Sequence, residues 1–251
     1  MNKIKWRKLK MKKKIIITSG PTNERIDSVM KITNMSTGAL GCVFAETFLE
    51  EKEDEIEKIF FISTKMSYKP RIKSQKIEYV IIESTQDLIN ALKKIFNENK
   101  IDIIIHSAAV GDYVGKYLIR AEDIVDEIWE TIQNTPTSKI TKERLMEIFE
   151  NPHLIADNSG KMSSYQPHLM TMFTLTPKVI GMIKKLEPNV KLVGFKLLDG
   201  VSKENLLEVA TKLREKNNAD YIVANDLSKI GGGNTGQGDG IPVPHDKRHR
   251  R

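Results

Sequence analysis

Short runs of β-branched residues alternate along this chain with longer stretches of helical periodicity, and this alternation narrows the choice of fold more than anything else in the sequence. Strands are expected at 15–18, 59–62, 78–82 and 101–105, and helices at 43–50 and 88–96. The strands lack polar alternation, as is typical of strands that are buried on both faces of a sheet. We therefore predict a doubly wound α/β fold, in which helices cover both faces of a mostly parallel, Rossmann-like sheet.

The same alternation resumes after a polar, irregular stretch around 134–167. Pro177 suits the first turn of a helix. The later elements are expected as strands at 168–175, 191–197 and 221–224 and as helices at 177–185 and 204–216. We predict a single domain over 15–230 with a mobile insert near 134–167. The last stretch, 231–251, has six glycines between Gly231 and Gly240, and no packed element is expected there.

The net charge of +7 on 251 residues raises the question of an acidic partner such as nucleic acid or a membrane surface. Eight Lys or Arg residues fall within 1–14 and four more within 247–251. Without these twelve residues and the two acids of the last stretch, 28 basic and 31 acidic residues remain, so the folded body is slightly acidic. We assign the excess positive charge to solvated tails at 1–14 and 231–251, and we expect neither nucleic acid nor a membrane as a partner.

Cys42 is the single cysteine, so no disulfide can form within the chain. This suits a reducing compartment. No apolar run approaches the roughly 20 residues that span a bilayer, and the run 15–17 is too short for the core of a signal peptide. We therefore expect a cytoplasmic protein.

Two stretches rich in Gly, Ser and Thr precede the first predicted helix. Residues 18–22 follow the first strand, and residues 34–41 lead into the helix. Glycine lets backbone amides approach a ligand, and a helix N-terminus carries partial positive charge, so this pattern favours phosphate at the carboxyl edge of the sheet. It also fits a plain loop. It matches neither the Walker A loop nor GxGxxG, and no acid closes the second strand at 62–64 to hold a ribose.

Asp112 and His106 belong to a small-residue stretch, 106–113, that follows a buried strand. Asp112 can coordinate a cation, bind a polar substrate or simply cap the next turn. We interpret His106 as a strand-end histidine with a hydrogen-bond partner, because no Ser/His/Asp spacing or His/Cys metal cluster accompanies it.

Three residues further along the chain are also candidates. Lys161, in the polar stretch 157–164, can neutralise phosphate charge or can be an ordinary surface lysine. Phe195 and Asn225 end two later strands, where they can contact a base or can belong to the core and a turn.

In this order, the motifs resemble those of the phosphopantothenate-cysteine ligase family of coenzyme A biosynthesis, in the stand-alone form without a flavin-dependent decarboxylase domain. The resemblance runs from Lys14 to Ile230. Its motifs, which are specific when taken together, are T-S-G-x-T, D-x-V-x-x-I-T-N-x-S-T-G-x-L-G, A-A-V-x-D-Y, K-x-S-S, T-P-K-V-I, G-F-K-L and A-N-D.

The resemblance implies a two-step ligation. The carboxylate of 4'-phosphopantothenate attacks the α-phosphate of a nucleoside triphosphate and releases pyrophosphate. The amine of cysteine then attacks the acyl-nucleotide, which forms the amide and releases the monophosphate. The resemblance implies CTP as the nucleotide, with ATP as the alternative, Mg²⁺ with its ligands left open, and a homodimer. Such chemistry needs no protein nucleophile, because the site has only to position and neutralise anions.

The resemblance also assigns roles to residues at matching positions. The nucleotide would contact Gly20, Ser36, Gly38, Gly41, Asp112, Lys161, Pro177, Lys178, Val179, Ile180, Phe195, Lys212, Lys216 and Asn225. The phosphopantothenate or its acyl-nucleotide would contact Asn34, Ala108, Ala109 and Asp112. The catalytic residues would be Lys161, which closes on the phosphates, Asn34 and Asp112. Lys212 and Lys216 share a helix face and match the family only after a one-residue shift.

Two departures from the family pattern stand out. Met30 follows Val29 where the pattern has D-x-V-R, and an arginine can hold a phosphate with two bonds whereas a methionine cannot. The family also continues past Asp226 through a further strand or hairpin and a closing helix, which 231–251 does not resemble. A catalytically impaired nucleotide-binding member is therefore one alternative, and a nicotinamide-dependent oxidoreductase is a less favoured one.

Overall fold

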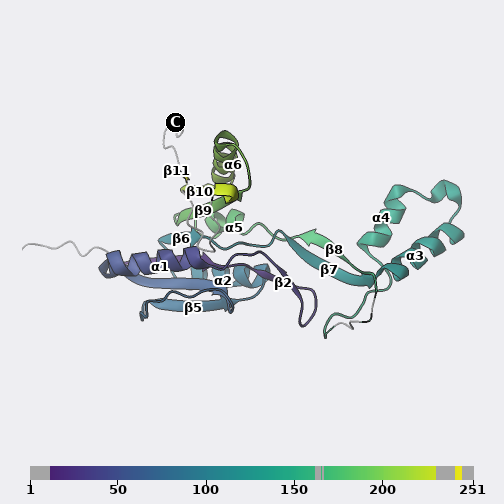
Figure 1. Ribbon diagram of the computed structural model, residues 1–251, viewed down its shortest axis with the longest axis horizontal. Coiled ribbons are helices and arrows are strands. Elements are labelled where there is room, and N and C mark those ends of the chain that lie inside the picture. Colours follow the sequence, from purple (N-terminus) through teal and green to yellow (C-terminus); the bar gives the residue numbers. More distant parts are fainter. Residues whose placement is uncertain (1–11, 162–164, 166, 230–240, 245–251) are drawn as a thin grey trace, which may run out of the picture. The chain divides into compact units, whose positions relative to one another are not determined.

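A computed structural model describes residues 12–161, 165, 167–229 and 241–244 of the chain (Figure 1). The chain folds into two compact units. The first unit contains the residues up to Thr22, then Asn34–Val110, and the residues from Lys178 onward. The second unit contains Asn23–Thr33 and Gly111–Pro177. Within the described part of the chain, no helix has the length and apolar character that crossing a membrane requires.

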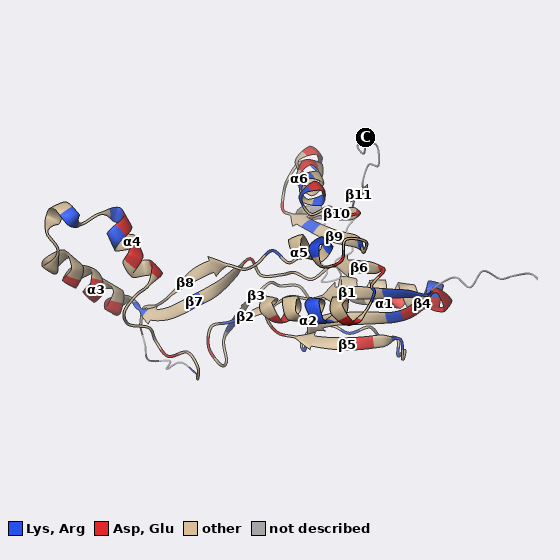
Figure 2. Ribbon diagram, turned by 180° about the vertical axis from the view of Figure 1, so that it is seen from behind, with Lys and Arg blue, Asp and Glu red and all other residues tan. Residues whose placement is uncertain are grey.

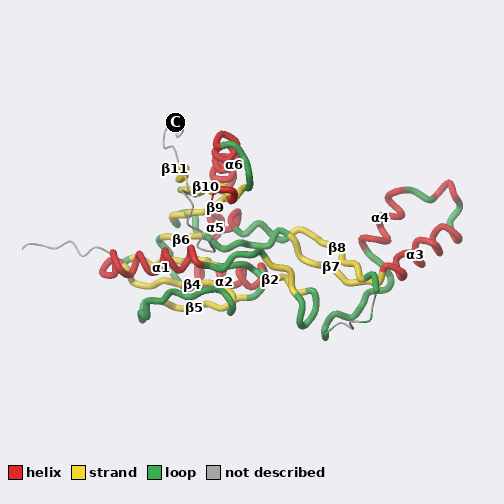
Figure 3. Tube along the Cα trace, viewed as in Figure 1, coloured by secondary structure: helices red, strands yellow, loops and turns green. Residues whose placement is uncertain are grey.

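A single sheet forms the centre of the first unit (Figure 3). Its strands are β1 (Lys13–Ser19), β4 (Ile56–Thr64), β5 (Ile77–Ile82), β6 (Ile103–His106), β9 (Lys191–Leu198), β10 (Tyr221–Asp226) and β11 (Ile241–Pro244), in the order β11-β10-β9-β6-β1-β4-β5. All neighbours are parallel except β10 and β11. The chain winds outward from β1 to β5 and then returns to β6 on the other side of β1, so the switch point of this doubly wound sheet lies between β1 and β6.

Helices cover both faces of this sheet, as predicted, but they do so unequally. The helices are α1 (Ala39–Lys52), α2 (Thr85–Glu98), α5 (Ile180–Leu186) and α6 (Lys203–Lys216). Alternate residues of β1 point to opposite faces. Ile15 and Ile17 pack with buried residues of α1, whereas Ile16 packs in a larger core with α2, α5 and α6. The fully buried isoleucines explain why β1 has no polar alternation.

The second unit is built around a two-stranded antiparallel ribbon. Its elements are β2 (Asn23–Arg25), β3 (Lys31–Thr33), β7 (Tyr113–Arg120), α3 (Ala121–Asn134), α4 (Lys142–Glu150) and β8 (Leu169–Leu175). β7 pairs with β8, and the two short strands β2 and β3 pair with each other. Tyr117, Ile119 and Ile124 form a small core. Figure 2 shows that α3 contains acidic but no basic residues. Short 3-10 helices lie at Glu53–Glu55 and Leu227–Lys229 in the first unit and at Thr137–Lys139 in the second.

The organisation between 111 and 177 differs from the predicted single domain with an insert near 134–167. This stretch belongs to a separate compact unit, and α4 lies inside the region predicted to be irregular. The strand predicted at 168–175 exists as β8, but it pairs with β7 and not with the central sheet. α4 buries only Ile148, so its sequence has too few core positions to signal a helix.

Two element boundaries and one additional strand also correct the predictions. α5 begins at Ile180 and not at Pro177, because the N–H groups of Gly181 and Met182 bond three residues back and form a turn before the helix. β1 begins at Lys13, inside the predicted basic tail. β11 lies where no packed element was expected, and it pairs antiparallel with β10. An edge strand needs only one row of backbone bonds, so a run with two prolines can occupy this position.

Candidate functional site

Three glycines bring the turn after β1 and the start of α1 into direct contact. Gly20 and Gly38 have φ values of 75° and 84°, which side chains rarely adopt. A Cβ atom on Gly38 would lie 2.9 Å from the Oγ atom of Ser19 and 3.1 Å from the backbone nitrogen of Gly20. A Cβ atom on Gly41 would lie only 2.3 Å from the same Oγ atom. Close approach of the helix N-terminus to this turn therefore requires glycine at these positions.

The turn and the helix start are also hydrogen-bonded to each other. The hydroxyl of Ser19 donates to the carbonyl oxygen of Gly38 at 2.8 Å. Ser36 and Thr37 lead into this N-terminus, and the Thr37 hydroxyl accepts the N–H of Ala39 at 3.3 Å. The first N–H groups of an α-helix have no partner inside the helix and favour an anion. This geometry supports the predicted phosphate site at the turn.

The stretch after β6 lies against the turn after β1 at the switch point of the sheet. The N–H of Ala109 donates to the carbonyl of Gly20 at 2.9 Å, and the N–H of Thr22 donates back to the carbonyl of Ala109 at 3.3 Å. The Nδ2 atom of Asn34 donates to the carbonyls of Ala109 and Val110 at 3.1 and 3.2 Å. The structure thus brings together Gly20, Asn34, Gly38, Gly41, Ala108 and Ala109, and their contact with a ligand stays a prediction.

His106 has the hydrogen-bond partner that was expected of a strand-end histidine. Its Nδ1 atom lies 2.9 Å from the Oγ1 atom of Thr18, and both residues are buried. Burial lowers the pKa of His106 from 6.5 to about 4, so the ring is neutral at pH 7. The neutral imidazole contacts the Thr18 hydroxyl, which also accepts the backbone N–H of Ala108.

The loop after β4 also packs against the candidate site, which the motifs did not reveal. The Oγ atom of Ser67 occupies the space beside Gly20, 2.0 Å from where a Cβ atom on that glycine would stand. The N–H of Tyr68 donates to the carbonyl of Thr37 at 3.0 Å. The ammonium of Lys69 bonds the carbonyls of Thr64 and Ser67 at 2.8 and 2.9 Å. The sequence of this loop contains no motif. Its packing against Gly20 and Thr37 therefore becomes visible only in the structure.

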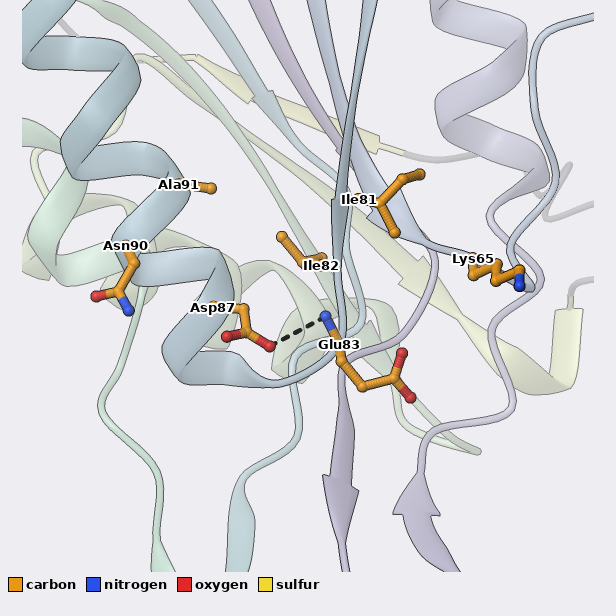
Figure 4. Close-up of a pocket in the computed structure, with 7 residues that line it drawn as sticks. All are labelled: Lys65, Ile81, Ile82, Glu83, Asp87, Asn90 and Ala91. Carbon is orange, nitrogen blue, oxygen red and sulfur yellow. Dashed lines mark hydrogen bonds between the residues drawn. The ribbon is translucent and has the colours of Figure 1, made fainter. Parts of the chain in front are cut away.

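An open groove of about 480 Å³ lies at the carboxyl ends of β4 and β5, beside the first turns of α2 (Figure 4). Lys65, Ile81 and Glu83 contribute to its lining. Asp87 accepts the N–H of Glu83 at 3.2 Å and forms a capping box with Ser84. None of the predicted site residues line this groove. The carboxylate of Asp87 in its lining serves to cap α2.

Phe195 and Asn225 lie on neighbouring strands, β9 and β10, on the same side of the switch point as β6. Phe195 is half-buried and meets Phe44 of α1 edge to face, with ring centroids 5.8 Å apart. Gly194 lets Ile180 pack against β9, since a Cβ atom there would lie 2.8 Å from its Cδ1 atom. Val179 is buried in the core as well. The side chains of Val179 and Ile180 therefore serve packing, and the recognition of a base by 177–180 stays a prediction.

Asp112, Lys161 and Pro177 belong to the second unit. The N–H of Thr176, just before Pro177, bonds the carbonyl of Asp112 at 3.0 Å. Lys161 is exposed and comes directly after Gly160, whose carbonyl accepts the N–H of Ser28 at 3.4 Å. The Ser residues of the K-x-S-S motif, at 163 and 164, lie outside the described residues.

The place of Lys212 and Lys216 in the fold argues against their predicted contact with the triphosphate. Both lie in the second half of α6, which runs back from the end of β9 to the start of β10. They are therefore near the amino ends of these strands, whereas Gly20 and Gly38 are at the carboxyl edge. Lys212 is also paired with Glu208 on its own helix. Their spacing on one helix face is correct, but sequence spacing does not show toward which edge of a sheet a helix end points.

The strand order, the switch point and the glycine-lined turn place the first unit in the Rossmann-like class of α/β folds. Residues 10–125 match the family described as DNA/pantothenate metabolism flavoprotein C-terminal domain. A solved structure described as the DNA/pantothenate metabolism flavoprotein from Streptococcus pneumoniae is 31% identical, covers 92% of this chain and 93% of its own, and superposes with a TM-score of 0.67. The chain belongs to this family, the phosphopantothenate-cysteine ligase family that its motifs resemble.

Longer relatives match over most of the chain as well. The coenzyme A biosynthesis bifunctional protein CoaBC of Thermococcus kodakarensis is 29% identical over 87% of this chain, and that of Methanocaldococcus jannaschii is 27% identical over 86%. The chain spans 42% and 41% of the length of these two proteins. A Cab2 mutant solved in complex with phosphopantothenate-cysteine is 17% identical, covers 94% of this chain and 81% of its own, and shares the fold with a TM-score of 0.59.

Proposed function

We propose that this chain ligates 4'-phosphopantothenate to cysteine through an acyl-nucleotide, with CTP in preference to ATP. The observation that carries the proposal is the turn at the switch point, where Gly20, Gly38 and Gly41 bring a helix N-terminus against the backbone that binds Asn34. The names of the CoaBC relatives and the ligand of the Cab2 complex agree with a substrate of this class.

The proposed reaction needs no covalent bond between the protein and its substrates. A carboxylate is a poor acyl donor, because its leaving group would be an oxide, and the mixed anhydride with a nucleotide supplies a good leaving group. The protein must bring two anions together and stabilise the charge that develops between them. Helix α1 offers its N-terminal amides to one anion, and the exposed ammonium of Lys161 supplies a mobile positive charge for the phosphates.

Mg²⁺ is the cation we propose for this reaction. No three His, Cys, Asp or Glu side chains among the described residues are grouped so that they form a protein cage for a metal. This fits Mg²⁺, which keeps several waters and binds mainly to substrate phosphates. When bound with the triphosphate, it neutralises charge on the phosphate oxygens. The residues of this chain then orient the triphosphate and exclude water from the acyl-nucleotide.

The test is a coupled measurement of pyrophosphate release and of phosphopantothenoylcysteine formation by mass spectrometry, with CTP, ATP, Mg²⁺, phosphopantothenate and cysteine. We expect release with CTP that depends on phosphopantothenate, and amide product only when cysteine is added. A folded sample that releases no pyrophosphate with either nucleotide contradicts the proposal. Faster turnover with ATP would retain the ligase and reverse the nucleotide preference.

One observation favours a second candidate, a nucleotide-binding member of the family with impaired catalysis. Met30 stands where the family motif has arginine, and its N–H donates to the carboxylate of Asp27 within a closed turn. Nucleotide binding by calorimetry without release of pyrophosphate would select this candidate.

A further inference from the structure

Thr18 and His106 lie beside the start of the stretch 107–110, to which Asn34 is bonded, and the motifs give neither of them a role in the reaction. Thr18 is fully buried near the end of β1, and His106 ends the neighbouring β6. Their register places them side by side, and the Oγ1 and Nδ1 atoms are 2.9 Å apart. Both are therefore part of the support for the stretch 107–110.

One tautomer of His106 provides an acceptor for the hydroxyl proton at this contact. The N–H of Ala108 donates to the Oγ1 atom of Thr18 at 3.2 Å, so this oxygen already serves as an acceptor. The Nδ1 atom of His106 is the acceptor that the structure places within reach of the hydroxyl proton. The hydroxyl proton of Thr18 has this acceptor when Thr18 donates to His106 and the neutral ring carries its own proton on Nε2.

The end of β1 and the turn after it form further hydrogen bonds with the stretch 107–110. The carbonyl of Thr18 accepts both the hydroxyl and the N–H of Ser107, at 2.7 and 3.2 Å. Ala109 is bonded to Gly20, and its carbonyl and that of Val110 receive the amide group of Asn34. A chain of bonds therefore leads from the buried ring of His106 to the side chain of Asn34.

We propose that Thr18 and His106 are positioning residues, which set the direction of the Thr18 hydroxyl and thereby fix the backbone of 107–110 on which Asn34 is held. The inference rests on the proposed function for the identity of the substrate that Asn34 meets. The hydrogen-bond chain itself does not depend on the reaction.

The first experiment is Thr18→Val, which keeps the shape of the side chain and removes both hydrogen bonds of the hydroxyl. A small displacement of a positioned group lowers the rate steeply. We expect kcat/KM for phosphopantothenate to fall about tenfold, with the affinity for CTP alone unchanged. Thr18→Ser restores the hydroxyl and recovers most of the loss. His106→Leu should act like Thr18→Val, whereas His106→Asn keeps an acceptor near the Nδ1 position and should act like the serine variant.

The matched control is Ile105→Val. Ile105 is buried in β6 next to His106, and this change removes one methylene group without touching a hydrogen bond. We expect it to lower the midpoint of thermal unfolding and to leave kcat/KM for phosphopantothenate within about twofold of the wild type. Equal kinetic losses in Ile105→Val and Thr18→Val would mean that strand packing alone matters, and this would overturn the proposal.

Two readouts do not require activity. Hydrogen exchange of the Ala108 amide should be faster in Thr18→Val than in the wild type and should return to the wild-type rate in Thr18→Ser. The ¹⁵N chemical shifts of the His106 ring should report a proton on Nε2 and not on Nδ1. Unchanged exchange or the opposite tautomer would overturn the proposal even if the ligase is active. A wild-type chain without ligase activity but with both signatures would contradict only the proposed function.

Discussion

The turn after β1 and the segment that carries Lys161 were both suggested by motifs rich in Gly and Ser, but the structure builds them in opposite ways. In the turn, Cβ atoms on Gly38 and Gly41 would meet Ser19 at 2.9 and 2.3 Å. In the segment, a Cβ atom on Gly160 would have no neighbour within 4 Å. The turn is closely packed and largely buried, whereas every residue of the segment 157–161 is exposed.

The difference indicates how the two regions would act on anions. A packed turn holds its amides in place before a ligand arrives, so it can stabilise charge without reorganisation. The segment 157–161 is joined to its surroundings by few bonds, among them Asn158 Nδ2 to the carbonyl of Ile26 at 2.9 Å. A lysine on such a segment can follow the phosphates and close on them. Each of the following predictions tests one side of this comparison.

Lys161→Ala should have the largest effect. If the ammonium neutralises charge in the transition state, kcat should fall about 10²- to 10³-fold, while the free energy of unfolding stays within about 0.5 kcal/mol because the side chain is exposed. The measurement is steady-state pyrophosphate release together with urea unfolding. Lys139→Ala, another exposed lysine of the second unit, is the control and should keep full activity. A normal kcat in Lys161→Ala would remove this residue from the mechanism.

The buried histidine beside the turn predicts a pH dependence of stability. Burial lowers the pKa of His106 from 6.5 to about 4 in the folded state, so between these values the unfolded chain binds more protons than the folded chain. Stability is therefore lost as the pH falls through this window, by on the order of 3 kcal/mol from this group. His106→Asn should remove that part of the slope in urea unfolding measured from pH 7.5 to 4. Parallel curves for the two proteins would contradict the assignment.

A matched pair of glycine substitutions compares the two regions directly. Gly41→Ala has no backbone strain, but its Cβ atom would overlap Ser19 and push α1 away from β1, which should cost about 1–3 kcal/mol of stability. Gly160→Ala should change stability by less than about 0.5 kcal/mol. Thermal and urea unfolding of both variants provide the measurement. Similar losses in the two variants would show that the turn is not the more tightly packed region.

The sequence was sufficient for the first unit because its signals are strong and local. Buried runs such as 15–17 have a period and composition that define parallel strands, and glycines at 20, 38 and 41 mark close backbone approach. The second unit was missed because α3 and α4 each bury a single residue in their own spans, Ile124 and Ile148. The role of Ser67 could not be read from sequence, because it depends on contact with a backbone position 47 residues away. The predicted contact of Lys212 and Lys216 with the triphosphate shows a second limit, because helix spacing carries no information on the direction of the helix in the sheet.

The smallest predicted effect concerns Met30, on the turn that is bonded to the Lys161 segment. Its side chain is 43% exposed, and its position in the turn is fixed by backbone bonds to Asp27, so an arginine can be introduced without a buried clash. If this position faces a phosphate, as in the family motif, Met30→Arg should lower the KM for phosphopantothenate about three- to tenfold. Met30→Lys should gain less, because an ammonium cannot form the paired bonds of a guanidinium. Met146→Arg, at a methionine with 49% exposure on α4, controls for the added charge and should leave the KM unchanged. An equal decrease in KM in Met30→Arg and Met146→Arg would mean that net charge and not a specific contact sets the affinity.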